Sequence, residues 1–95
     1  MKYGKLLVTR TVNDYIAEDI GFSKEITNIF KRYLNHDWGE MCEEDKQLND
    51  KAIELEKELS IGERVLAAYN TTKGKVYIIT EWDRSATTIL FADEY

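Results

Sequence analysis

The chain has 95 residues, of which 43% are hydrophobic and 33% are charged, and its formal net charge at pH 7 is -5. This balance is typical of one globular domain, residues 1–95, and excludes an intrinsically disordered chain. No apolar run approaches the roughly 20 residues that a membrane-spanning helix requires, so we expect no membrane contact.

The acidic residues are concentrated in one part of the chain. Residues 37–58 carry nine acidic and three basic side chains, whereas residues 1–12 carry three basic side chains and no acidic one. A protein that binds nucleic acid directly needs a broad basic face, which this distribution does not provide. The acidic segment instead favours a protein partner that has a basic surface.

The first third of the chain has the pattern of a strand followed by helical segments. The β-branched residues within 5–12 predict a strand, and Asn13 is the candidate N-cap of a short helix that stops at Gly21. Ser23 is a second candidate N-cap. The apolar spacing that follows it predicts a helix that ends near residues 35–36.

A further helix and three strands are predicted in the rest of the chain. Asp37 is the expected N-cap of this helix, whose apolar period continues to Leu59. The strands are predicted over residues 64–69, 75–82 and 87–91. Joined by short turns, they should form an antiparallel meander with the helices on one face, which is a two-layer α+β domain of order β-α-α-β-β-β. The pattern leaves the neighbour of the first strand open.

The acidic helix is the first candidate binding surface. Asp50, Glu54 and Glu58 recur on one helical face, where like charges repel one another weakly. Two interpretations stay open: a solvated helix face, and a docking face that imitates nucleic acid on a basic partner. In this segment the expected contact residues are Asp37, Trp38, Glu40, Glu43, Glu44, Asp50 and Glu54. No calcium-loop pattern of spaced aspartates is present, so no metal site is predicted.

His36 and Cys42 are the candidates for nucleophilic chemistry. Such a site needs a base next to the thiol and a third group that orients the base, and no motif near either residue provides this arrangement. We therefore expect no enzymatic activity and no cofactor. The neighbouring Trp38 fits a helix end that closes the core as well as a contact surface. Because a single cysteine cannot form an internal disulfide, a reducing, bacterial-type cytoplasm is the expected location.

The turn at residues 81–85 is the second candidate binding surface. Asp83 can bond turn amides, and Arg84 can pair with a neighbouring carboxylate or stack on Trp82. An ordinary hairpin turn and a contact loop formed by Trp82, Asp83 and Arg84 both fit this pattern. A concave pocket lined by Arg84, Trp82 and Tyr77 would favour the binding of a small ligand.

Five short motifs are distributed over nearly the whole chain. They are Val8-Thr9-Arg10, Asp37-Trp38-Gly39, Glu43-Glu44-Asp45-Lys46, Ile78-Ile79-Thr80-Glu81 and Asp83-Arg84-Ser85-Ala86-Thr87-Thr88. In these motifs the chain resembles a group of small "plasmid-related" proteins of bacterial plasmids, conjugative elements and prophages. The last motif is fairly specific. This chain has Ala92-Asp93 where the resemblance leads us to expect a proline before Glu94-Tyr95.

The resemblance implies an accessory protein of a mobile genetic element, and small acidic proteins in that setting often inhibit host defence. We therefore expect a non-enzymatic protein that binds and inhibits a host defence complex, of anti-CRISPR or anti-restriction type, through an acidic surface. Two alternatives stay open. One is a small regulatory or structural accessory protein that acts by dimerisation, and the other is a small-ligand-binding protein.

Overall fold

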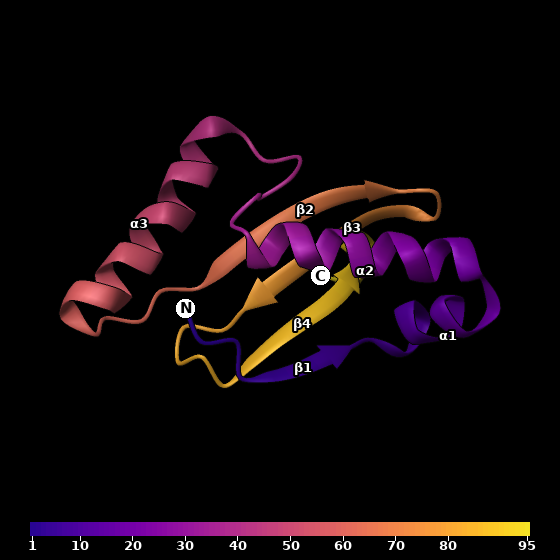
Figure 1. Ribbon diagram of the computed structural model, residues 1–95, viewed down its shortest axis with the longest axis horizontal. Coiled ribbons are helices and arrows are strands. Elements are labelled where there is room, and N and C mark those ends of the chain that lie inside the picture. Colours follow the sequence, from indigo (N-terminus) through magenta and orange to yellow (C-terminus); the bar gives the residue numbers. More distant parts are fainter.

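Three α-helices and four strands make up most of the chain in the computed structural model, which describes residues 1–95. In chain order the elements are β1 (Lys5–Val8), α1 (Arg10–Glu18), α2 (Ile20–Leu34), α3 (Glu43–Leu59), β2 (Val65–Thr71), β3 (Gly74–Thr80), β4 (Ala86–Phe91) and the 3-10 helix η1 (Ala92–Glu94) (Figure 1). The predicted α+β class is confirmed, with one helix more than the predicted order contains. None of the helices combines the length and the apolar composition that crossing a bilayer requires.

The sheet has the strand order β1-β4-β3-β2. The predicted meander of β2, β3 and β4 is confirmed, since both of its pairings are antiparallel. β1 lies on the other side of β4 and runs parallel to it, which makes the sheet mixed. All three helices lie between β1 and β2, which form opposite edges of the sheet. These two strands run in the same direction, so the chain needs a long connection to return from the end of one to the start of the other.

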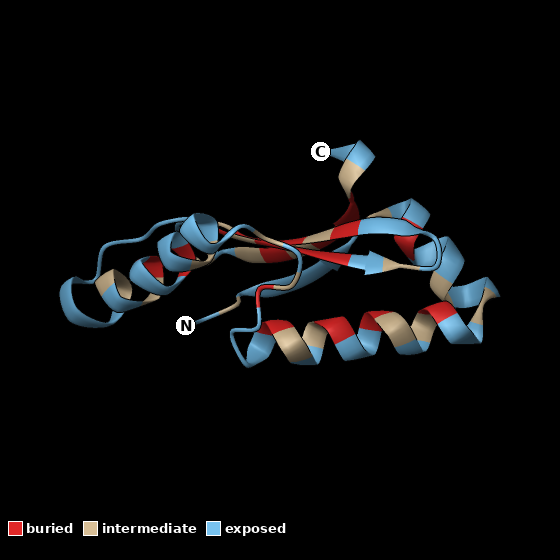
Figure 2. Ribbon diagram, turned by 90° about the horizontal axis from the view of Figure 1, so that it is seen from above, coloured by how far each residue is buried: buried red, intermediate tan, exposed pale blue.

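The main core lies between α2 and one face of the sheet (Figure 2). The buried residues of α2 are Phe22, Ile26, Ile29 and Tyr33, which recur every three or four positions as the inward side of a helix does. They belong to the same core as alternate strand residues, of which Ile78 in β3 is completely buried. The helix on one face of the sheet is therefore as predicted.

The opposite face of the sheet carries no α-helix. Only η1 and the residue after it fold over this face, and the ring of Tyr95 lies 5.8 Å from the ring of Tyr77 (Figure 2). Ile79 and Leu90 are nevertheless buried. Both faces of β3 are therefore apolar, as its continuous run of apolar residues indicates.

The predicted first strand is too long, because the chain turns into a helix after Val8. Thr9 is β-branched and favours a strand, but its Oγ1 accepts a hydrogen bond from N of Val12, 3.4 Å away, and caps α1. Asn13, the predicted N-cap, consequently lies inside α1. A local side-chain bond has overridden the strand preference of these residues.

The break between the first two helices also falls earlier than predicted. Asp19 is the N-cap of α2, since its Oδ1 accepts a hydrogen bond from N of Phe22 at 3.1 Å. The predicted stop at Gly21 and the predicted cap at Ser23 are wrong, because both residues lie in the first turns of α2.

Asp37 does not cap a helix, and α3 begins only at Glu43. The intervening segment instead pairs with the outer edge of β2: N of Glu40 donates to O of Ala68 at 2.6 Å, and N of Ala68 donates to O of Trp38 at 3.3 Å. Gly39 lies between them with a φ of 73°, and a Cβ there would approach the ring of Tyr69 to 2.6 Å. This close contact requires glycine.

Candidate functional site

The structure separates the ten predicted contact residues into two surfaces. Seven lie on or just before α3, and the other three lie in the β3–β4 turn at residues 81–85. Eight of the ten are exposed, whereas Trp38 and Arg84 are largely buried. These two residues are therefore not part of an exposed contact surface.

The acidic face of α3 consists of the exposed carboxylates Glu43, Glu44, Asp50, Glu54 and Glu58. None of the five takes part in an ion pair, since the ion pairs of the structure involve other carboxylates. Only two of the 17 residues of α3 are buried, so most of the helix faces solvent. The acidic face thus carries charge that no neighbouring side chain neutralises at contact distance.

The local sequence explains where α3 begins and how it is attached. Acidic residues 43–45 occupy its first turn, where carboxylates interact favourably with the positive end of the helix dipole. The amide of Asn49 bonds both O and N of Leu66, at 2.7 and 3.4 Å, which holds α3 beside β2. Figure 1 shows α3 set apart from α2 at one end of the molecule.

Trp38 belongs to the core, so the interpretation as a helix end that closes the core is confirmed and its place among the contact residues is wrong. Its side chain is 2% exposed, and its ring centroid lies 5.4 Å from that of Tyr33. Its indole Nε1 donates a hydrogen bond to Oδ1 of Asp50, 2.9 Å away. Asp50 therefore anchors α3 to the core in addition to contributing to the acidic face.

Asp37 is exposed, but a neighbouring arginine already neutralises its charge. Nε of Arg32 lies 2.8 Å from Oδ2 of Asp37, and N of Gly39 donates to Oδ1 at 3.2 Å. The hydrogen bond from Arg32 holds the pKa of Asp37 below its ordinary value. Glu40 is exposed and takes part in no ion pair, so it extends the acidic face more effectively than Asp37 does.

The β3–β4 turn has the internal bonds of an ordinary hairpin turn. Oδ1 of Asp83 accepts a hydrogen bond from N of Ser85 at 3.0 Å. Hydrogen bonds from Ser85 lower the pKa of Asp83. Trp82 precedes it and leaves most of its side chain in solvent. Asp83 therefore shapes the turn, and Trp82 is the residue that the turn exposes.

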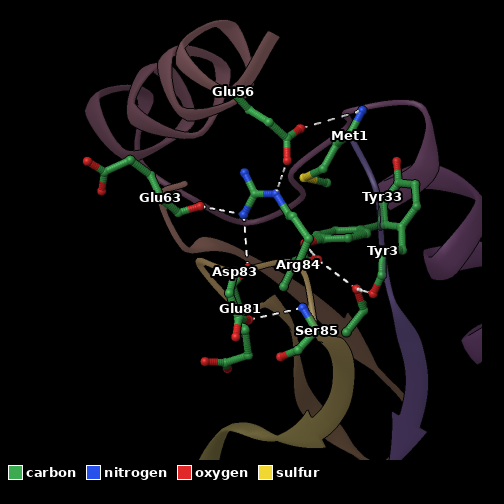
Figure 3. Close-up of polar contacts among 11 residues, drawn as sticks. Met1, Tyr3, Tyr33, Glu56, Glu63, Glu81, Asp83, Arg84 and Ser85 are labelled. Carbon is green, nitrogen blue, oxygen red and sulfur yellow. Dashed lines mark hydrogen bonds and ion pairs between the residues drawn. The ribbon is translucent and has the colours of Figure 1, made fainter. Parts of the chain in front are cut away.

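Arg84 connects three parts of the fold, which corrects its predicted role as an exposed contact residue. Its side chain is 8% exposed. Nε donates to the carboxylate of Glu56 on α3, and Nη1 donates to the backbone oxygens of Glu63 and Glu81 at 2.6 and 3.0 Å (Figure 3). Its φ of 60° lies in the left-handed region, which costs about 1–2 kcal/mol for a residue other than glycine. The bonds of the guanidinium offset this strain.

A cavity of about 740 Å³ opens between the C-terminal half of α3 and the β3–β4 turn. Trp82 and Arg84 line it, but Tyr77 does not, so the three residues named from the sequence do not line one pocket together. The charged lining residues are the basic Lys2, Lys57 and Arg84 and the acidic Glu56 and Asp83. The cavity is therefore more basic than the protein as a whole.

One polar atom of Arg84, a residue that lines this cavity, lacks a partner. Nη2 of Arg84 is buried and makes no hydrogen bond, whereas Nε and Nη1 of the same guanidinium are bonded. A buried donor without an acceptor is unfavourable by about 1–3 kcal/mol, and more where the donor is charged. The free donor suits an anionic group that brings its own acceptor oxygens.

His36 and Cys42 lie in the segment between α2 and α3. The imidazole of His36 stacks on the ring of Trp38, with 5.2 Å between the centroids. Cys42 is exposed immediately before α3 and makes no capping hydrogen bond. No three His, Cys, Asp or Glu side chains lie close enough together to hold a metal ion.

Sequence reasoning did not identify Glu56, Lys2 and Lys57 as members of a site. Their convergence depends on α3 lying beside the β3–β4 turn, and Glu56 meets Arg84 across 28 residues of chain. The one available signal was the helical period, since Glu56 follows the buried Ala52 by one helical turn and so points inward.

Comparisons of the chain with known protein families, with curated proteins and with solved structures give no match. The acidic face, the cavity and the sheet of this chain are therefore the structural features that bear on its function.

Proposed function

We propose that the protein is a non-enzymatic binding protein that docks the acidic face of α3 on a basic surface of a protein partner. The partner we propose is a host defence complex, of anti-CRISPR or anti-restriction type, because the sequence resembles accessory proteins of mobile elements. The observation that carries the proposal is the acidic face, whose five carboxylates are exposed and take part in no ion pair.

The arrangement of these carboxylates suits a surface that accepts nucleic acid. From Glu43 to Glu58 the helix rises about 22 Å, and residues four positions apart are about 6 Å apart along its axis. A row of negative charges on a narrow projecting helix can enter a basic groove that a flat surface cannot enter. Uncompensated charge also accelerates association with a partner of opposite charge and makes binding sensitive to salt.

A charge-reversal experiment tests this proposal. Glu43, Glu44, Glu54 and Glu58 are changed to Lys together, while Asp50 is left in place because it bonds Trp38. The matched control changes the same number of exposed, unpaired acids elsewhere to Lys, namely Asp14, Glu18, Glu63 and Asp93. Thermal melts verify that both variants fold.

The readout is binding to purified restriction and CRISPR effector complexes at low and at physiological salt. We expect the parent and the control variant to bind and to inhibit nucleic-acid binding by the effector, more weakly as salt rises. The acidic-face variant should lose both effects at either salt concentration. Equal binding by the two variants would show that the acidic face is a solvated helix surface without a partner.

We infer a second candidate function, the binding of a small anion in the cavity beside Arg84. The observation that favours it is the unpartnered Nη2 of Arg84 together with the two lysines of the lining, Lys2 and Lys57. An anion with phosphate or carboxylate groups would supply the missing acceptor and would be held by the lysine ammonium groups. The exposed ring of Trp82 would cover its apolar part.

Thermal shift measurements with inorganic phosphate, citrate and a nucleoside monophosphate test this second function. A ligand that binds the folded state raises the melting temperature progressively with its concentration. The double variant Lys2→Gln/Lys57→Gln should lose the shift, whereas Lys51→Gln, on the outer side of α3, should keep it. If none of the three probes raises the melting temperature of the parent, the cavity has no such function.

A further inference from the structure

The two edges of the sheet differ in how they are protected. The outer edge of β2 is covered by residues 38–40, which bond N and O of Ala68. The outer edge of β1 has no neighbour, because β1 pairs with β4 alone. Figure 1 shows β1 along the margin of the sheet with no element beyond it. An uncovered edge strand is a template for pairing with another strand.

The uncovered strand is apolar and accessible on both of its faces. Leu6, Leu7 and Val8 are 51%, 43% and 37% exposed. Successive side chains of a strand point to opposite faces, so Leu7 lies on the face of the sheet opposite to that of Leu6 and Val8. Three consecutive exposed apolar residues are unusual for an edge that faces solvent, since such edges normally carry charge or proline.

The backbone hydrogen-bonding groups of β1 have partners on one side of the strand only. N of Lys5 donates to O of Ser85, and N of Thr9 donates to O of Ile89, both at 3.1 Å. The groups of alternate residues in a strand point to opposite sides within the sheet plane, so the N–H and C=O groups of Leu6 and Val8 point away from β4. These four groups form the hydrogen-bonding edge that a further strand can use.

We propose that this edge joins two copies of the chain, which pair their β1 strands antiparallel about a two-fold axis at Leu7. In this register Leu6 of each copy exchanges both backbone hydrogen bonds with the partner's Val8, so that all the outward groups of both strands are bonded. Leu7 meets the partner's Leu7 as the central, non-hydrogen-bonded pair. The sheet then continues from one copy into the other.

Charge complementarity favours a second copy over an unrelated strand. The same register places Lys5 opposite the partner's Thr9. Oγ1 of Thr9 donates to Oε1 of Glu94 at 2.9 Å, so a carboxylate lies beside Thr9. Lys5 and Thr9 are on the same face of the strand, and therefore the ammonium group of each copy faces the carboxylate that the other copy holds at Thr9. Because of the two-fold symmetry, this contact occurs twice in the dimer.

A covalent test examines the register directly, in a Cys42→Ser background that removes the native thiol. Leu7→Cys should form a disulfide-linked dimer under mild oxidation, because directly opposed residues bring their Cα atoms within the range that a disulfide spans. Leu6→Cys, the matched control in the same strand, should not, since the two copies of residue 6 are diagonal and too far apart. Leu48→Cys, exposed on α3, reports the background from random collision.

Sedimentation velocity of the unmodified chain over a range of concentrations provides the second measurement. The pairing surface is small, so we expect a dimer that dissociates on dilution. Leu7→Lys should shift the midpoint of association to at least roughly tenfold higher concentration, as loss of a central apolar contact does, and Leu48→Lys should leave it unchanged. A monomer at every concentration, or cross-linking of Leu7→Cys no faster than that of Leu48→Cys, would overturn the proposal.

Discussion

The hydroxyl oxygen of Tyr33 lies 2.6 Å from Oγ1 of Thr80 in the core, and this contact begins a chain of hydrogen bonds with one direction. Oγ1 of Thr80 lies 2.8 Å from that of Thr87, which in turn donates to O of Tyr3 at 2.7 Å. A carbonyl oxygen can only accept, so Thr87 uses its single proton there. Thr80 must therefore donate to Thr87, and Tyr33 must donate to Thr80.

This direction predicts unequal costs for removing the hydroxyl groups. Thr87→Val leaves the donor of Thr80 and the carbonyl of Tyr3 without partners, so it should reduce the free energy of unfolding by about 2–3 kcal/mol. Tyr33→Phe removes only the first donor and should cost about 1 kcal/mol. Urea unfolding at neutral pH measures both. Equal costs would mean that the bonds run in another direction.

Tyr33 also predicts a loss of stability in alkali. Burial raises its pKa to about 12, against about 10 in an unfolded chain. The folded state holds the proton more tightly, so this contribution to stability is complete below about pH 10 and is lost as the pH rises from 10 towards 12. The free energy of unfolding should fall over that range, and it should fall less steeply in Tyr33→Phe. An identical slope in the two proteins would contradict the assignment to Tyr33.

Substitution of Arg84 should destabilise the fold more than substitution of most other charged residues. Arg84→Ala removes the bonds to Glu56, Glu63 and Glu81 together and keeps the left-handed backbone, so we expect a loss of about 2–3 kcal/mol. The control Arg10→Ala removes an exposed arginine and should cost less than about 0.5 kcal/mol. Thermal or urea unfolding compares them. A small effect at Arg84 would show that α3 is held against the turn by other contacts.

Alanine substitutions at Gly39 and Gly74 test how firmly residues 38–40 are held at the edge of β2. Both have positive φ, but a Cβ at Gly39 would overlap the carbonyl of Ala68, whereas a Cβ at Gly74 would meet open space. Gly74→Ala should therefore cost only the backbone strain, about 1–3 kcal/mol, and Gly39→Ala clearly more. Comparable melting temperatures for the two variants would mean that residues 38–40 can leave the edge of β2 at little cost.

Amide hydrogen exchange should distinguish α3 from α2. Only two of 17 residues of α3 are buried, compared with four of 15 in α2, which lies directly on the sheet. Local opening requires the least free energy where few apolar contacts are lost. We expect the amides of α3 to exchange faster than those of α2 under native conditions. Equal protection would mean that the two helices unfold as one unit.

The C-terminal half of the fold could be predicted because its signals are local. Ile78 and Ile79 belong to one apolar run, and both are buried, as a strand covered on two faces requires. The turns on either side of β3 are too short for anything except antiparallel neighbours. The exposed acids of α3 were likewise predictable from composition and helical period.

The N-terminal boundary and the polar partners of Trp38 and Arg84 could not be predicted, because the residues that meet there are distant in the chain. Thr9 follows the last residue of β1 and is the N-cap of α1. Its hydroxyl group also donates a hydrogen bond to Glu94, 85 residues later. Tryptophan and arginine are common in contact surfaces. In the folded chain, however, Trp38 donates a hydrogen bond to Asp50 and Arg84 donates one to Glu56. Those pairings exist only once α3 lies beside β2.

The strand order gives the proposed pairing of two copies a further consequence. β1 forms one edge of the sheet, and α3 is attached beside β2 at the other edge. If two copies join at β1, their α3 helices lie at opposite ends of the assembly and both stay accessible. Such a particle is bivalent. On a target that repeats its basic surface, the second contact would form at the high effective concentration set by the first, and avidity would exceed the affinity of one helix.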